Sequence, residues 1–323
     1  MSAELAQIAS RLRALVHRAL AAAGLEIRRV RHAPAERPLA LQGTKTIEVD
    51  GFALTANESH ALGAYLAQFP LYSRNLPRIA SYLHAKYPRL EIVDVGANIG
   101  DTAALLRAAG VEDTIHAVEG VEQYYELLAK NAKTLGDVRP YRAFLAEASS
   151  VRPLAVSATG GTAWLGAGDS STETVSLSDF VAEHAIGDVR LLKLDTDGFD
   201  LAIIRGGLDW IAEQRPVLFF EYFEPGLRAA GDDGLSTLQA LRGVGYDTIL
   251  YYDNFGRFLC ATSLANEAQL RQLYAYIAGG RGGFHYYDVC VFHSQDDDLA
   301  AHVVEQEERF FAELAETEDK TPA

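Results

Sequence analysis

From residue 91 onward, short apolar segments alternate with stretches of helical spacing, and this alternation restricts the fold more than any other feature of the chain. The apolar runs predict strands at 92–95, 115–119, 189–195, 217–221, 248–252 and 289–293. Helices are predicted between them at 99–109, 121–135, 177–184, 200–212 and 235–242. Residues 217–220 are apolar on both strand faces, which is typical of a strand covered by helices on both sides. The sequence therefore predicts a doubly wound α/β sheet, whose ligands bind at the carboxyl ends of its strands.

The remaining segments predict an N-terminal helical arm and cap at 1–88 and an acidic C-terminal helix or tail at 296–323, around a main domain at 89–295. Residues 4–23 carry apolar side chains at helical spacing, with arginines on the opposite side. Such a helix either packs on its own domain or on a second copy in a homo-oligomer, or makes a peripheral contact with an anionic membrane surface. A short strand is predicted at 46–49. The acidic tail, with Glu307 among its glutamates, is expected to form a solvated helix face.

The charge and the cysteine content argue against several classes of protein. The formal net charge is -15 at pH 7, which disfavours nucleic acid as a partner because phosphate binding requires a basic face. Cys260 and Cys290 are too few for a disulfide framework or a zinc cage, and we expect both to be buried as small apolar side chains. No apolar run reaches the ~18 residues of a membrane span. A cytoplasmic location is therefore expected.

A glycine turn follows the first strand of the main domain. It reads Asp94-Val95-Gly96-Ala97-Asn98-Ile99-Gly100-Asp101, and an alanine- and leucine-rich helix begins there. Glycines let the backbone bend sharply and approach a ligand beneath the helix N-terminus. Glu119 closes the second strand 23 positions after Gly96, near the separation at which an acid reaches ribose hydroxyls. The turn and Glu119 together predict a nucleoside-binding crevice.

The electrostatics of this turn favour a cationic ligand. The turn lacks the G-x-G-x-x-G triplet of dinucleotide sites, and Asp94 and Asp101 would place negative charge beside a pyrophosphate. A ligand with ammonium and sulfonium groups suits these carboxylates better. An NAD-dependent dehydrogenase is accordingly the less favoured alternative.

Residues 93–101, Val-Asp-Val-Gly-Ala-Asn-Ile-Gly-Asp, resemble the first motif of class I methyltransferases, and the segments 191–200, 204–207 and 215–221 resemble the FkbM family. The motif typical of the family at residues 193–200 is Lys-x-Asp-x-Glu-Gly-x-Glu. Asp197 and Asp200 replace the glutamates here, and Gly120 stands where the family usually has a proline after the strand-two glutamate. The likeness extends over about 90–225.

The resemblance implies a methyltransferase that uses S-adenosylmethionine, on a mostly parallel, seven-stranded, Rossmann-like sheet. The donor would be bound by Asp94, Gly96, Ala97, Asn98, Gly100, Asp101, Glu119 and Gly120. By analogy with class I methyltransferases, the third strand ends near 144–147 and places Leu145 beside the adenine.

Four polar side chains are expected where the fourth and fifth strands end: Lys193, Asp195, Asp197 and Glu221. An alcohol is a poor nucleophile, so methyl transfer to oxygen needs a base within hydrogen-bond reach. Asp195 is the favoured base or acceptor-orienting group. Lys193 shares a strand face with Asp195, and its plainer interpretation is a buried cation paired with Asp195 or Glu221. Asp195, Asp197 and Glu221 could instead hold a divalent cation such as Mg²⁺, which is not favoured because no histidine joins the cluster.

His285, in the glycine-rich segment before the last strand, is a second candidate base because histidine titrates near neutral pH. His116 lies within the second strand, and a satisfied core position is expected for it. Aromatic residues that follow strands five to seven could stack on an acceptor; they are Tyr222, Phe223, Tyr251, Tyr252, Phe255, Tyr286 and Tyr287.

The resemblance implies O-methylation of a sugar, a glycan or a natural product, with a small molecule or glycan as the partner. One alternative is an N-methyltransferase, but the Asn/Asp-Pro-Pro-Tyr/Phe signature of that class is absent at 195–198. Another alternative is a non-catalytic subunit that binds S-adenosylmethionine. The carboxylates of Asp195, Asp197 and Glu221 argue against it.

Overall fold

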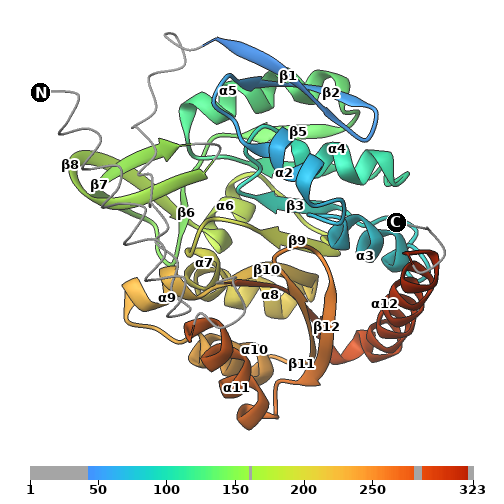
Figure 1. The fold of residues 1–323 in the computed structure, drawn as a ribbon. Helices are drawn as coiled ribbons and strands as arrows, with labels where there is room; N and C mark the ends of the chain where they lie inside the picture. The colour runs from blue at the N-terminus through green and yellow to red at the C-terminus, as the bar shows by residue number, and fades with distance from the viewer. Residues whose placement is uncertain (1–42, 160–161, 280–285, 319–323) are drawn as a thin grey trace, which may run out of the picture. The chain divides into compact units, whose positions relative to one another are not determined.

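A computed structural model describes residues 43–159, 162–279 and 286–318 of the chain (Figure 1). Of residues 152–171 it describes only the backbone. The amphipathic helix predicted at 4–23 lies outside the described residues. Within the described part, no helix is long and apolar enough to cross a membrane.

An eight-stranded sheet forms the centre of the fold, in the order β12-β11-β13-β10-β9-β3-β4-β5. Five neighbouring strands run parallel, while β13 is antiparallel to both β10 and β11, and β12 is antiparallel to β11. The bounds are β3 (Ile92–Val95), β4 (Ile115–Val118), β5 (Val138–Tyr141), β9 (Leu191–Leu194), β10 (Val217–Phe223), β11 (Tyr246–Asp253), β12 (Phe258–Ser263) and β13 (Tyr286–His293). The predicted doubly wound, mostly parallel sheet is confirmed. The predicted number of seven strands is wrong, because β12 adds a half-buried edge strand.

Helices cover both faces of this sheet (Figure 1). They are α2 (Leu62–Gln68), α3 (Asn75–Leu83), α4 (Asp101–Ala108), α5 (Glu122–Asn131), α6 (Leu177–Glu183), α7 (Asp200–Gly206), α8 (Leu208–Gln214), α9 (Glu224–Ala230), α10 (Leu235–Gly243), α11 (Glu267–Ala278) and α12 (Asp297–Glu318). Two short 3₁₀ turns, Ala132–Thr134 and Ser294–Asp296, complete the helical segments.

Two apolar cores result from the period of two along each strand. Ile92 and Leu191 face a core with α3, α4, α5 and α12, whereas the following residues, Val93 and Leu192, face a second core with α6, α7, α8, α10 and α11. A sheet with a core on each face requires strands that are apolar on both faces, as the sequence pattern at 217–220 predicted.

Residues 44–83 also belong to the first core. The antiparallel hairpin of β1 (Thr44–Val49) and β2 (Phe52–Asn57) buries Ile47 and Leu54 together with side chains of α4 and α5. The strand predicted at 46–49 is confirmed as part of β1. This hairpin leads directly into α2, which becomes part of the site described below.

Two predicted elements are wrong in detail. The helix predicted at 200–212 is divided into α7 and α8 near Gly207. A Cβ added at Gly207 would lie 2.5 Å from the Leu177 side chain. The third strand ends at Tyr141 rather than near 144–147. Leu145–Ala146 instead form β6, which pairs with β8 (Thr162–Ser176) in a separate three-stranded sheet completed by β7 (Ser150–Thr159).

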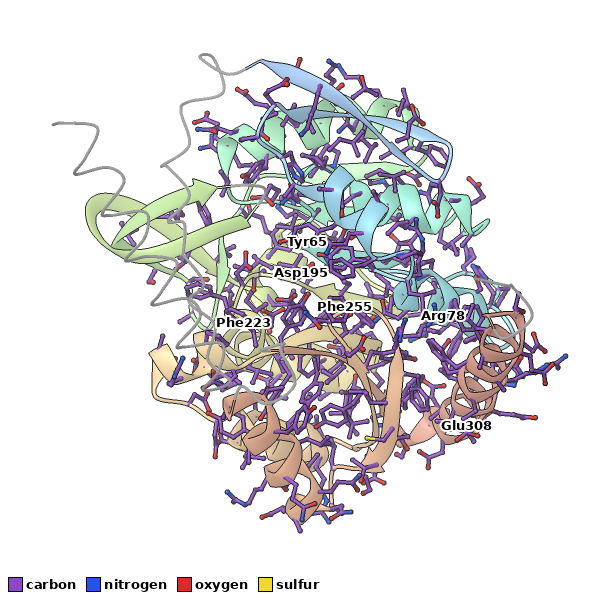
Figure 2. All side chains as sticks on the ribbon, in the orientation of Figure 1. Tyr65, Arg78, Asp195, Phe223, Phe255 and Glu308 are labelled. Carbon is purple, nitrogen blue, oxygen red and sulfur yellow. The ribbon has the colours of Figure 1, made fainter. Side chains whose placement is uncertain are left out.

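The C-terminal helix α12 packs on α3 through a buried ion pair. Arg78 Nη2 lies 2.7 Å from Glu307 Oε2, and the Arg78 guanidinium also lies over the ring of Phe310. Figure 2 labels Arg78 on α3 and Glu308 on α12. Glu307 is fully buried, whereas its neighbour Glu308 is exposed. The expectation that Glu307 lies on a solvated face is therefore wrong, because α3 supplies a cation that sequence periodicity does not reveal.

Candidate active site

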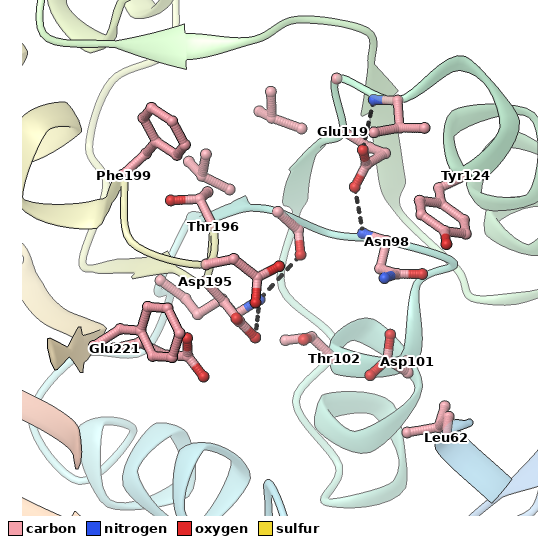
Figure 3. Close-up of a pocket in the computed structure, with 18 of the residues that line it drawn as sticks. Leu62, Asn98, Asp101, Thr102, Glu119, Tyr124, Asp195, Thr196, Phe199 and Glu221 are labelled. Carbon is pink, nitrogen blue, oxygen red and sulfur yellow. Dashed lines mark hydrogen bonds and ion pairs between the residues drawn. The ribbon is translucent and has the colours of Figure 1, made fainter. Parts of the chain in front are cut away.

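A cavity of about 340 Å³ opens at the carboxyl ends of β3, β4, β9 and β10 (Figure 3). Val95 and Val118 line it from the ends of the first two strands, and Asp195 and Glu221 line it from the next two. The cavity therefore lies where a doubly wound sheet is expected to bind its ligands.

The glycine turn forms one wall of this cavity. Gly96 has φ +79°, and a Cβ there would lie 1.9 Å from the carbonyl oxygen of Asp195, so no larger residue fits. Gly96 and Asn98 line the cavity, whereas Ala97 is buried and Gly100 is the residue before α4, with φ +91°. The amides of Gly96 and Ala97 both donate to Val118 O, which fixes the turn to β4.

Glu119 faces the cavity with both carboxylate oxygens held by backbone amides. Asn98 N donates to Oε2 at 3.0 Å, and Val121 N donates to Oε1 at 2.7 Å. Burial raises the pKa of Glu119 to about 7, although the two amides act in the opposite direction. Each oxygen keeps a second lone pair for a ligand hydroxyl.

Gly120 shows why the family's proline is absent at this position. A Cβ on Gly120 would lie 2.2 Å from the ring of Phe144, so this ring occupies the space of a side chain. Phe144 and Leu145 line the cavity on the same side as Gly120. Leu145 is thus placed at the cavity even though the third strand ends earlier than predicted.

Lys193 is a buried cation held by two carboxylates. Its Nζ lies 2.9 Å from Asp94 Oδ1 and 3.4 Å from Asp195 Oδ2, and it donates to Gly96 O at 3.3 Å. Burial acts to lower the pKa of Lys193, but Asp94 and Asp195 outweigh it, and the pKa is raised. The predicted partner Asp195 is confirmed. Asp94, directly opposite on β3, is the closer partner in place of the predicted alternative Glu221.

Asp195 is the most accessible carboxylate of the group, with its side chain 48% exposed. Glu221 ends up beside it, because β10 continues the parallel register that pairs Phe220 with Leu194. Burial and the nearby carboxylates of Asp195 and Asp200 raise the pKa of Glu221 well above its ordinary value. Asp195 and Glu221 therefore form a carboxyl floor, and Lys193 is the one cation among the described cavity residues.

The turn after β9 is shaped by Asp200. Its Oδ2 accepts hydrogen bonds from Thr196 N at 3.3 Å, Thr196 Oγ1 at 3.0 Å and Gly198 N at 3.4 Å. Asp197 has φ +53° and lines the cavity. Asp101, the first residue of α4, also lines it, and burial raises the pKa of this carboxyl. The shorter aspartate at 200 thus binds the turn rather than a ligand.

Several cavity residues come from segments without a recognised motif. His60 Nε2 lies 3.1 Å from Asn98 Oδ1, while its Nδ1 accepts from Leu62 N. Seven further residues line the cavity: Tyr65, Phe69 and Tyr72 of α2 and the turn after it, and Phe223, Asn254, Phe255 and Tyr286. Of these, only Phe223, Phe255 and Tyr286 belong to the aromatic group expected from the sequence. A lone histidine and scattered aromatics carry no sequence signal that could assign the others.

A model of the methyltransferase FkbM domain matches residues 94–248. Residues 94–248 thus match the FkbM methyltransferase domain. The resemblance seen in the sequence is confirmed over these residues, and the sheet has the predicted doubly wound, Rossmann-like arrangement with β12 as an additional strand.

Solved methyltransferases are similar to this chain at low identity. Methyltransferase FkbM from Methylobacillus flagellatus KT is 16% identical with a TM-score of 0.32, over 42% of this chain and 33% of that one. This chain thus spans about a third of the length of that protein. Precorrin-6y C5,15-methyltransferase from Geobacter metallireducens GS-15 is 12% identical with a TM-score of 0.35, over 67% and 86% of the two chains. M. jannaschii TYW2 in complex with AdoMet is 12% identical with a TM-score of 0.37, over 78% and 87%. Curated proteins give no match to the sequence.

The described residues do not support the alternative that Asp195, Asp197 and Glu221 hold a magnesium ion. Within the described residues, no three His, Cys, Asp or Glu side chains are grouped so that they could hold a metal ion, and this includes Asp195, Asp197 and Glu221.

The two histidine predictions fall in different parts of the chain. His285 lies outside the described residues. His116 is buried with both nitrogens satisfied, by Glu91 Oε1 at 2.7 Å and Tyr141 Oη at 3.1 Å. The predicted core position of His116 is confirmed.

Proposed function

We propose that this chain is an S-adenosylmethionine-dependent O-methyltransferase that acts on a hydroxyl group of a sugar, a glycan or a natural product. The observation that carries the proposal is Glu119, whose carboxylate faces the same cavity as Asp195 and Glu221. One end of the cavity thus suits a nucleoside, and the other end offers a base.

The residues at the Glu119 end fit the proposed donor. Glu119 has lone pairs left to accept hydrogen bonds from ribose hydroxyls, and Gly96 keeps the turn free of a side chain. Leu145 and Phe199 add apolar surface. The excess of carboxylates favours a ligand of positive charge. When bound, S-adenosylmethionine supplies an electrophilic methyl group on a cationic sulfur.

At the other end, Asp195 is the proposed base. Half of its side chain is accessible, and Lys193 Nζ, 3.4 Å away, fixes its position. In the transfer, the acceptor oxygen forms a bond to the methyl carbon, the carbon–sulfur bond breaks, and the hydroxyl proton passes to Asp195 and then to water. The protein aligns the acceptor and removes this proton, which is what an in-line displacement requires.

Two measurements test this proposal. Isothermal titration should show binding of S-adenosylmethionine and of S-adenosylhomocysteine to the wild-type chain and clearly weaker binding to Glu119→Gln. Incubation with trideuteriomethyl-labelled donor and a panel of glycans and hydroxylated metabolites should then yield an acceptor heavier by one labelled methyl group. Absence of binding of either nucleoside by the wild-type chain would refute the donor assignment. Label found on nitrogen alone would refute the O-methyl assignment.

We also propose a cytoplasmic location. It is supported by the state of the two cysteines, since Cys260 and Cys290 are both free thiols. Cys290 is buried as expected, whereas Cys260 is only half-buried.

A further inference from the structure

Aromatic rings form part of the cavity lining. Tyr65 stacks on Tyr72 at 5.5 Å between ring centroids, and Phe69 packs against Phe255 at 4.5 Å. We call these four residues the aromatic wall. Figure 2 shows Tyr65 and Phe255 near Asp195 at the centre of the molecule. Every member of the wall lies outside residues 94–248, so none belongs to the matched domain.

The aromatic wall lines the same cavity as the carboxyl floor of Asp195 and Glu221. Burial, together with these two carboxyl groups, also raises the pKa of Tyr72. The cavity therefore combines π faces and carboxyl groups.

Carboxyl groups outnumber cations in the cavity as a whole. Five carboxyl groups line it, those of Asp101, Glu119, Asp195, Asp197 and Glu221, against the single cation Lys193 among the described lining residues. Lys193 is closest to Asp94, whose side chain is fully buried. The charged neighbours that act most strongly on the Glu221 side chain are carboxyl groups, those of Asp195, Asp197, Asp200 and Asp288. The proposed donor carries one net positive charge, which balances only part of this set.

We propose that the acceptor carries a protonated amine, held between the aromatic wall and the carboxylates of Asp195 and Glu221, close to the hydroxyl that is methylated. This proposal rests on the proposed function and names its substrate class. Aromatic faces and carboxylates both attract an ammonium group, most strongly where water is excluded.

The amine serves as an anchor and not as the nucleophile. Nearby carboxylates favour the charged form of an amine, and a protonated nitrogen has no lone pair to attack the methyl group. The hydroxyl oxygen therefore receives the methyl group, its proton leaves through Asp195, and the ammonium charge is unchanged. An anionic aromatic site is thus compatible with O-methylation of an amino alcohol, an amino sugar or an alkaloid.

A matched pair of small probes tests the anchor. Benzylammonium and benzyl alcohol have the same ring and similar size but differ in charge. Each is titrated by calorimetry or NMR into wild-type protein saturated with S-adenosylhomocysteine. We expect benzylammonium to bind about tenfold more tightly or better, the scale of a partly desolvated cation on aromatic and carboxylate groups. Equal binding of benzyl alcohol, or no binding of benzylammonium at millimolar concentration, would overturn the proposal.

Variants separate the anchor from other causes. Glu221→Gln removes the charge and Phe255→Leu removes a π face while keeping apolar volume, and each should lower the preference for benzylammonium severalfold without changing the affinity for S-adenosylhomocysteine. Glu213→Gln, an exposed acid on α8, changes the net charge equally and should leave the preference intact. A preference unchanged in both site variants contradicts the anchor. If the wild-type chain does not bind S-adenosylhomocysteine, that result would instead contradict the proposed function.

Discussion

Lys193→Met should destabilise the fold by about 3–5 kcal/mol, the usual cost of removing one member of a buried ion pair. Lys193 Nζ lies 2.9 Å from Asp94 Oδ1, and the two side chains are 5% and 0% exposed. Asp94 Oδ2 has no hydrogen-bond donor among the described residues, so nothing else compensates its charge. Methionine fills a similar apolar volume, so the measured loss reports mainly on the unpaired carboxylate.

The pH dependence of this loss has a definite sign. Burial already raises the pKa of Asp94 above 3.8 in the folded wild-type chain, and removal of the lysine raises it further. A carboxyl whose pKa is higher in the folded state stabilises the fold below its unfolded pKa and loses that contribution as the pH rises. The difference in unfolding free energy between Lys193→Met and wild type should therefore widen from pH 5 to pH 8, by at most about 1.4 kcal/mol per pH unit.

Urea denaturation followed by circular dichroism at several pH values measures this difference. The matched control is Lys193→Met/Asp94→Leu, in which no buried charge remains and most of the lost stability should return. The reasoning fails if Lys193→Met unfolds within about 1 kcal/mol of wild type. It also fails if the double variant is no more stable than the single one.

Three further predictions concern the reaction and the donor. Asp195→Asn should lower kcat by about a hundredfold or more, measured with an acceptor identified by the labelled donor, while the Kd for S-adenosylmethionine stays within a few fold. A near-normal kcat would show that Asp195 has a structural role. The affinity for S-adenosylmethionine should fall as the pH drops below the pKa of Glu119, raised to about 7, because the protonated carboxyl loses acceptor capacity. Calorimetry of Glu119→Gln should show no such pH dependence. His60→Phe loses the 3.1 Å contact with Asn98 and should raise the KM for S-adenosylmethionine by up to about tenfold with little change in kcat; an equal fall in kcat would contradict a role limited to the donor side.

The central strands could be predicted from sequence, and the edge strands could not. Strands β3, β9 and β10 are buried on both faces, so their sequences are mostly apolar, with one charged residue in each: Asp94, Lys193 and Glu221. At one edge, β5 reads Val-Arg-Pro-Tyr, and at the other, β12 is only half-buried. These strands are harder to recognise, because an edge is covered less completely than a central strand and tolerates proline.

The candidate site also has a part that could be predicted from the sequence and a part that could not. Asp195, Glu119 and Glu221 follow apolar strands, and parallel strands bring their carboxyl ends to one edge, so their convergence at the cavity follows from the pattern alone. The choice of Asp94 over Glu221 as the closest partner of Lys193 depends on strand order and register, which the pattern does not contain. The aromatic wall depends on how α2 and the turn after β11 pack over the sheet. That packing could not be predicted from the local sequence.

The source of each part of the cavity indicates how the proposed reaction and its specificity are divided in this chain. The carboxylates of Glu119, Asp195 and Glu221 lie within residues 94–248, whereas the aromatic wall lies outside them. His60 joins the two parts, because its contact with Asn98 connects the segment before α2 to the turn whose amide holds Glu119. Under the proposed function, the matched domain would then supply donor binding and proton removal. The segments outside it would select the acceptor, and changes in them should alter which molecule is methylated before they alter whether methylation occurs.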